Sequence, residues 1–167
     1  YGLGLAAYRM AQAYTTQQPL VRLATKPLAR IAGLAGGSAH LTRLAGSEIV
    51  YLHEVRAPGA VSLVTEVGVR LPALSTASGR IMLAHLPEAE RRAVFTSSGE
   101  RGRYSEVREQ LSAYRRQGWA GECEEVSRGQ ESVAVAVLRP QAVARRHELA
   151  HAHGAGIGAL EIGERPL

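Results

Sequence analysis

The hydrophobic pattern of this chain changes from helical to alternating, and the change limits the fold to one that combines helices with a sheet. Over residues 20–34 the apolar side chains recur at the spacing of one helical face. Gly36 and Gly37 follow, and glycine in this position commonly ends a helix. Apolar and polar residues then alternate over 39–44 and 49–55. These two runs, separated by a short turn, predict an antiparallel β-hairpin.

The rest of the chain contains further helical and alternating segments in mixed order. Pro27 is expected to kink or divide the helix at 20–34, and Ser105 is expected to serve as an N-cap. Further helices are predicted at 3–14, 78–85 and 106–117, with a shorter one starting at Pro87. Further strands are predicted at 61–66, 69–71, 119–126, 131–138 and 157–162. This order predicts an α+β domain in which helices flank a central antiparallel sheet.

Length and composition are those of an ordinary folded domain. The chain has 167 residues, of which 46% are hydrophobic and 21% charged, and we expect one domain over residues 1–167. Its one cysteine, Cys123, cannot form an intrachain disulfide, which agrees with a reducing, cytoplasmic compartment. The sequence has no apolar run near the roughly 20 residues that span a bilayer, so no membrane partner is expected.

The net charge of +5 does not by itself indicate a nucleic-acid surface. Arginines are spread along the chain and alternate with glutamates, as in residues 100–103, which is typical of a solvated surface. The sequence contains no Asp, which excludes a Ser-His-Asp triad in its usual form. Cys123 lies among glutamates, and these would raise the pKa of its thiol. The chain is therefore expected neither to bind DNA by itself nor to be an enzyme.

The stretches 68–84, 115–125 and 129–137 carry three motifs in a fixed order, and together they resemble the effector domain of IclR-type bacterial transcription regulators. Residues 68–84 are similar to the family signature, in which a Gly-x-x-x-Pro entry leads through a loop of small residues to a Gly-Lys-Ala-x-Leu-Ala helix. Arg80 replaces the usual Lys. Residues 115–125 resemble the family's Arg-x-x-Gly-Tyr-x-x-Asp-Asp-Glu-Glu segment, and 129–137 resemble the strand that follows it. Residues 139–156 depart from the family, which has a short turn there.

The resemblance implies a GAF-like (profilin-like) fold that binds a small effector without a cofactor. The effector is expected to be a carboxylate or an aromatic acid. Its binding is expected to alter DNA binding by a winged helix-turn-helix that is absent from this chain. Residues 1–4 and 26–32 resemble the family's linker helix and first domain helix. Homodimers or tetramers are usual in the family, and operator DNA would be contacted only through the missing domain.

The segment Thr76-Ala77-Ser78-Gly79 lies where a loop enters a predicted helix, and it suits an anion on physical grounds. Small residues let a ligand approach the backbone, and the N–H groups at a helix N-terminus favour negative charge. Two purely structural roles remain open: Thr76 or Ser78 serves only as an N-cap, and Gly79 only permits close packing. By resemblance, Ala77, Ser78 and Gly79 hold the positions whose backbone donates hydrogen bonds to the ligand.

The resemblance also assigns residues from the strands to the ligand site. Glu122 falls at the acidic position and Ser132 at the small polar position opposite. The alternative for Glu122 is a solvated strand carboxylate. Glu161 is expected to face the site from the last strand, where it would repel an anion unless paired and would favour a ligand with a hydroxyl or amine. Leu63 and Leu71 are candidate apolar walls or ordinary core residues.

Two other classes of function remain open. His147-Glu148-x-x-His151 matches the pattern of zinc hydrolases, in which two histidines share a helical face and Glu148 acts as base. Ile157 stands where a metzincin would have its third histidine, and His153 could join incidental metal binding instead. The second alternative is a dimerisation module without a ligand. It rests on the apolar residues of the predicted first helix, Leu3, Leu5, Tyr8 and Met10.

Overall fold

The computed structural model describes residues 4–17, 19–60, 67–138 and 157–163, the last range as backbone. The helices are α1 (Leu5–Gln17), α2 (Pro19–Ala35), the 3₁₀ turn η1 (Ala73–Ser75), α3 (Ala77–Ala84), α4 (Glu88–Ser98) and α5 (Tyr104–Gln117). The strands are β1 (Ser38–Ala45), β2 (Glu48–Arg56), β3 (Arg70–Pro72), β4 (Trp119–Cys123), β5 (Glu131–Leu138) and β6 (Ile157–Gly163). Within these ranges, no helix combines the length and the apolarity needed to cross a bilayer. The predicted helices and hairpin are confirmed, while the strand predicted at 61–66 lies outside the described residues.

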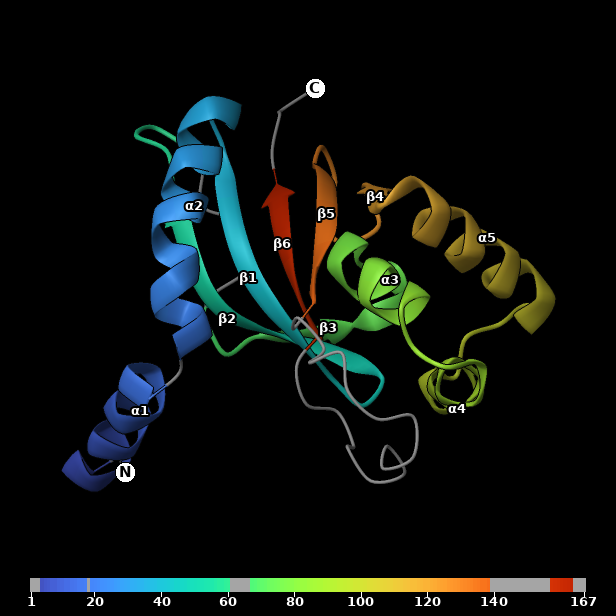
Figure 1. The fold of residues 1–167 in the computed structure, drawn as a ribbon, viewed down its shortest axis with the longest axis horizontal. Coiled ribbons are helices and arrows are strands. Elements are labelled where there is room, and N and C mark those ends of the chain that lie inside the picture. The colour runs from blue at the N-terminus through green and yellow to red at the C-terminus, as the bar shows by residue number, and fades with distance from the viewer. Residues whose placement is uncertain (1–3, 18, 61–66, 139–156, 164–167) are drawn as a thin grey trace, which may run out of the picture.

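The six strands of the described part form one antiparallel sheet in the order β3-β2-β1-β6-β5-β4. The predicted hairpin is β1–β2, and β1 pairs on its other side with β6 from the end of the chain. Strands β5 and β4 continue the sheet beyond β6. Helix α2 lies on one face of the sheet, and α3, α4 and α5 lie on the other (Figure 1). The fold is therefore α+β, with helices flanking an antiparallel sheet, as predicted.

Helix α2 covers the β1–β2 side of the sheet through a small apolar cluster. The cluster consists of Ala24, Leu28, Ala32, Ala39 and Leu41. Its helical members are four residues apart, as on one helical face. Of the apolar residues that the pattern assigned to this face, Ala24 and Leu28 are buried, whereas Leu23 and Leu34 are exposed, so the predicted face is confirmed only in part. The helix is not divided at Pro27. Pro27 is exposed, so water can bind the carbonyl oxygen that the proline leaves without an N–H partner.

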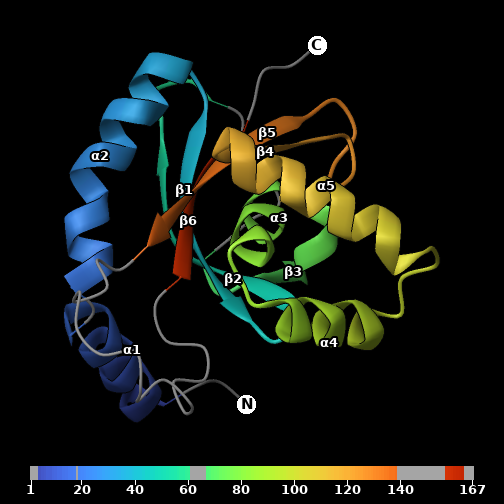
Figure 2. The same cartoon turned by 45° about the vertical axis from the view of Figure 1, so that its right-hand side comes forward.

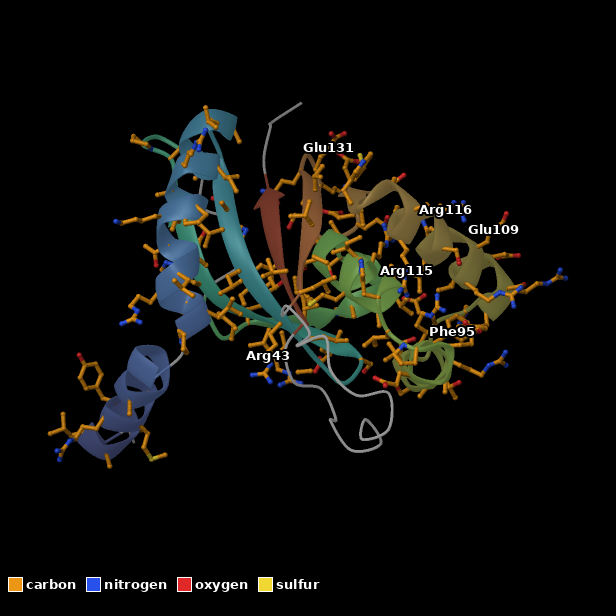
Figure 3. All side chains as sticks on the ribbon, in the orientation of Figure 1. Arg43, Phe95, Glu109, Arg115, Arg116 and Glu131 are labelled. Carbon is orange, nitrogen blue, oxygen red and sulfur yellow. The ribbon has the colours of Figure 1, made fainter. Side chains whose placement is uncertain are left out.

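Helix α5 begins earlier than the sequence predicted. Its N-cap is Arg103, and no side chain makes a capping hydrogen bond, so the prediction of Ser105 as N-cap is wrong. Tyr104, the first helical residue, packs on Phe95 of α4 with the ring centroids 5.5 Å apart (Figure 3). This aromatic contact lies in the first turn of the helix, which places Ser105 inside the helix rather than at its cap.

Strand β4 ends at Cys123, three residues before the predicted end. Glu124 has a φ of 56°, a conformation that takes the chain out of the strand. The carboxylate of Glu124 accepts a hydrogen bond from the N–H of Gly129 at 2.8 Å and closes the turn that leads to β5.

Helix α3 is the central element of the second face. All eight of its residues are buried, and α5 passes over the helix (Figure 2). Gly79 lies against the backbone of η1, because a Cβ atom there would be 2.1 Å from the carbonyl oxygen of Ala73. Glycine is thus required for close approach, which is one of the structural roles that the sequence left open. Arg115 ties α5 to the end of α3, donating from Nη1 to the carbonyl of Ala84 at 3.3 Å (Figure 3).

We expect Gly79→Ala to destabilise the fold, because its methyl group would overlap backbone atoms of Ala73. The free energy of unfolding should fall by about 2–3 kcal/mol. Urea unfolding followed by circular dichroism measures the loss. Gly33→Ala is the matched control, since nothing lies within 4 Å of its Cβ position in α2. That variant should gain up to about 1 kcal/mol, and equal stability of the two variants would contradict the close contact.

Candidate functional site

The turn that enters α3 is closed by the side chain of Thr76. Thr76 is the N-cap of the helix, and its Oγ1 accepts a hydrogen bond from the N–H of Gly79 at 3.1 Å. Its hydroxyl hydrogen is directed to the carbonyls of Pro72 and Ala73, both 3.4 Å away. The hydroxyl of Thr76 and the N–H of Gly79 are therefore engaged with each other, and Thr76 has the capping role that the sequence left open.

Ser78 is the residue of this turn whose hydroxyl makes no hydrogen bond to the described residues. Its side chain is fully buried. A buried hydroxyl without a partner costs about 1–3 kcal/mol. The N–H groups of Ala77 and Ser78 lie in the first turn of α3, where a helix has no acceptors of its own. This turn therefore suits a small acceptor that bears negative charge.

The structure brings the predicted strand residues Glu122 and Ser132 together. They are register partners on β4 and β5, and both are buried. Ser132 donates from Oγ to Oε1 of Glu122 at 2.8 Å, and the N–H of Glu125 donates to Oε2 at 3.0 Å. Glu122 is thus not the solvated carboxylate of the alternative interpretation. Both of its oxygens are held in place by the protein itself.

Arg80 joins the turn of α3 to the strand that carries Glu122. Its Nε donates to the carbonyl of Leu74 at 2.7 Å, and its Nη1 donates to the carbonyl of Gly121 at 3.2 Å. Its Nη2 forms an ion pair with Glu125, the residue whose N–H holds Glu122. The flat fork of a guanidinium makes these three contacts at once, which the single ammonium of a lysine does not. Arg80 therefore sets the first turn of α3 beside β4.

Strand β1 contributes buried polar side chains that sequence reasoning missed. Ala39 and Leu41 face α2, so the alternating residues Ser38 and His40 face the α3 side of the sheet. Both are buried, and the ring of His40 meets that of Tyr51 edge-on, with the centroids 5.1 Å apart. The alternating pattern of the sequence placed His40 on the opposite face of the strand from Ala39, so it did indicate which face His40 occupies. Burial of this second face was not visible in the sequence.

A charged pair lies next to His40 on strand β2. Oε1 of Glu54 is 3.4 Å from Nε2 of His40 and 2.7 Å from Nε of Arg56. Burial lowers the pKa of His40, and the charge of Glu54 opposes this without reversing it. Burial acts to raise the pKa of Glu54, but the hydrogen bond from Arg56 and the charges of both neighbours bring it below its usual value. At neutral pH this region contains a neutral imidazole and a carboxylate balanced by Arg56.

The other predicted site residues are not brought to the turn by described contacts. Leu71 on β3 is half-buried and packs against the core cluster that surrounds α3, which is the alternative to a pocket wall. Glu161 occupies the register position between His40 and Ala134, and its side chain lies outside the described part of the chain. Leu63 also lies outside the described residues.

The zinc alternative concerns residues 147–151, and these lie outside the described residues, as does His153. Within the ranges that the structure describes, no three His, Cys or Glu side chains are grouped as metal ligands would be. Cys123 is exposed, and its hydrogen bond to Glu131 raises the pKa of its thiol, with smaller contributions from burial and the neighbouring glutamates. The direction is the predicted one, and it disfavours thiolate chemistry.

Comparisons with known proteins point to one family. Residues 12–143 match the family described as "Bacterial transcriptional regulator IclR C-terminal". The HTH-type transcriptional regulator KdgR of Dickeya chrysanthemi is 26% identical over 145 residues, which are 83% of this chain and 48% of that protein. The Pca regulon regulatory protein of Pseudomonas putida is 28% identical over 145 residues, which are 82% of this chain and 50% of that protein. The chain thus spans about half the length of these relatives.

Solved structures show the same fold. The IclR transcriptional regulator from Alicyclobacillus acidocaldarius has a TM-score of 0.77 at 21% identity, covering 98% of this chain and 64% of that one. The Thermotoga maritima IclR has a TM-score of 0.76 at 21% identity, covering 96% and 63%. These neighbours define the class as a GAF-like α+β domain, as the resemblance implied. The chain belongs to the IclR family of bacterial transcriptional regulators and corresponds to their C-terminal domain; the relatives named are regulators rather than enzymes.

We expect the free energy of unfolding to fall as the pH is lowered below about 6.5, the ordinary pKa of histidine. Because the pKa of His40 is lower in the folded state, the unfolded state binds more protons at pH values between the two pKa values. The stabilisation is therefore fully present above the unfolded-state pKa and is lost as the pH falls towards the folded-state pKa. The slope should be below about 1.4 kcal/mol per pH unit. Urea unfolding at about pH 7.5 and at about pH 5.5, one on each side of the ordinary histidine pKa, measures how the free energy of unfolding changes with pH.

His40→Gln should flatten this pH dependence. His53→Gln is the matched control, because His53 lies on β2 and contacts Thr25 of α2 instead, with 3.3 Å between its Nε2 and Oγ1 of Thr25. The control should keep the slope of the unmodified chain. If His40→Gln also kept that slope, the burial of a neutral imidazole at His40 would be contradicted.

Proposed function

We propose that this chain is the effector-binding and self-associating domain of a cytoplasmic bacterial transcription regulator. The proposed site lies between the first turn of α3 and the neighbouring ends of β1, β5 and β4. The observation that carries it is Ser78, whose hydroxyl is buried at a helix N-terminus without a partner among the described residues. Membership of the IclR family supports the same site, because the stretch 68–84 that resembles the family signature contains this turn.

The proposed effector is a small carboxylate or an aromatic acid. The N–H groups of Ala77 and Ser78 and the positive end of the helix dipole attract an anion. The dipole contributes about 0.3–1 kcal/mol at an exposed site and up to about 2 kcal/mol at a partly buried one. Ser132 and Glu122 form the opposite wall, where a carboxylate of fixed orientation can accept a hydrogen bond from the ligand. The proposed site therefore has a donor side and an acceptor side.

Effector binding would reach DNA through the arrangement of paired domains. In this proposal a winged helix-turn-helix outside this chain contacts the operator, and the present domain binds and signals without catalysis. A ligand changes the arrangement only through different affinities for its two states. The side chains of Leu5, Tyr8 and Met10 on α1 are 74%, 61% and 71% exposed, which supports a homodimer or tetramer formed through this helix.

A screen of small carboxylates by thermal unfolding of the purified chain tests the proposal. An acid present at about 100 times its Kd should stabilise the chain by roughly 2.7 kcal/mol. Ser78→Ala should weaken binding of that acid about five- to tenfold, because one buried hydrogen bond is lost. Without ligand, the same variant should be as stable as the unmodified chain or more so, since it removes a buried hydroxyl without a partner.

Ser97→Ala is the matched control, because Ser97 is an exposed helical serine of α4, far in sequence from the turn. It should leave the affinity unchanged. If no acid binds, the chain acts as a dimerisation module alone and the proposal is wrong. If Ser78→Ala binds the acid as tightly as the unmodified chain, the first turn of α3 is not the site.

A further inference from the structure

Ser38, the first residue of β1, carries a second buried hydroxyl that has no hydrogen-bond partner among the described residues. Its side chain is fully buried. The penalty for such a group is the same as for Ser78, so two unsatisfied hydroxyls are buried in one small domain.

The sheet register aligns Ser38 with the strand residues of the proposed site. Ser38 pairs with Gly163 of β6, Gly163 pairs with Ser132 of β5, and Ser132 pairs with Glu122 of β4. Residues paired in this way project on the same face of a sheet. That face is the α3 side, because Ala39, the next residue of β1, contacts α2. Ser38, Ser132 and Glu122 therefore stand in one row on the α3 side of the sheet.

Gly163 leaves this row without a side chain at the position between the two serines. The Cα atoms of Ser38 and Ser132 are two strand spacings apart, roughly 9.5 Å. A molecule lying along the row can thus contact one serine at each end, with glycine backbone beneath its middle.

The side chains of the row limit the chemical class of ligand that can bind there. The row consists of two hydroxyls, a carboxylate and, at the end beside Ser38, Arg56 of β2, whose guanidinium donates to Glu54; none of these side chains is an apolar surface on which an aromatic ring could rest. The next row along β1 continues with His40, whose neighbour on β2 is Glu54. A ligand hydroxyl can donate to these acceptors and can accept from Ser38, whereas the hydroxyl hydrogen of Ser132 is already donated to Glu122.

We infer that the effector is an aliphatic hydroxy acid, bound by its carboxylate at the first turn of α3 and by a hydroxyl at Ser38. The inference rests on the proposed function and excludes the aromatic acids that the proposed function allows. It adds Ser38 to the site as a residue that distinguishes hydroxylated from unsubstituted acids.

Isothermal titration of the purified chain with matched pairs of acids tests the inference. The probes are gluconate with hexanoate, 2,3,4-trihydroxybutanoate with butanoate, and benzoate. At least one hydroxylated acid should bind ten times more tightly than its unsubstituted partner. Ser38→Ala should reduce that ratio about fivefold by removing one hydrogen bond, while leaving the affinity for the unsubstituted acid unchanged.

Ser38→Cys, which keeps nearly the same volume, should give the same reduction, and Ser97→Ala should give none. Tighter binding of benzoate or of the unsubstituted acids would overturn the inference and leave the proposed function in place. The inference would also be overturned if neither Ser38 variant altered the ratio of affinities for the hydroxylated and the unsubstituted acid. Failure of every acid to bind would overturn the proposed function itself.

Discussion

The backbone contact between Gly79 and Ala73 is the constraint on which the rest of the site depends. Because Gly79 has no side chain, α3 lies directly against η1, and all eight of its residues are buried. This placement carries the hydroxyl of Ser78 into the interior and brings Arg80 within reach of β4. A larger residue at Gly79 would push the helix outward, and both features would be lost together. The stability of the fold and the geometry of the proposed ligand site therefore have the same structural origin.

The second constraint is the buried charge of Arg80. Its guanidinium is satisfied by two carbonyls and by Glu125, so it links the turn of α3 to β4 without leaving an unpaired cation in the interior. Glu125 in turn donates its N–H to Glu122, whose other oxygen is held by Ser132. The acceptor side of the site is thus oriented by the same network that positions the donor side. A ligand at the proposed site would not have to order these groups on binding, and the entropic cost of association would be lower.

The parts of the fold that depend on neighbouring residues could be predicted from the sequence, and the resemblance identified Glu122 and Ser132, but the buried Ser38 could not be predicted. The β1–β2 hairpin and part of the buried face of α2 follow from local periodicity. Ser38 and Ser132 come into one row only through β6, and no local pattern reveals that the first strand pairs with the last. The roles of Thr76 and Ser78 depend on the helix starting at Ala77, because a shift of one or two residues would exchange the capping and the free hydroxyl.

The charges around the proposed site favour a ligand that carries a hydroxyl as well as a carboxylate. Glu54 is balanced by Arg56 and Glu125 by Arg80, whereas in the described ranges no cationic side chain forms an ion pair with Glu122. A second anion about 6 Å from Glu122 would be repelled by roughly 2–3 kcal/mol at an effective dielectric constant of 20. The helix dipole returns at most about 2 kcal/mol of this. A hydrogen bond from the ligand to a charged acceptor contributes about 1.5–3 kcal/mol. For an acid without a hydroxyl, the repulsion from Glu122 would therefore cancel most of the favourable free energy of binding at the proposed site. A hydroxyl that donates a hydrogen bond to Glu122 would make the net free energy of binding favourable.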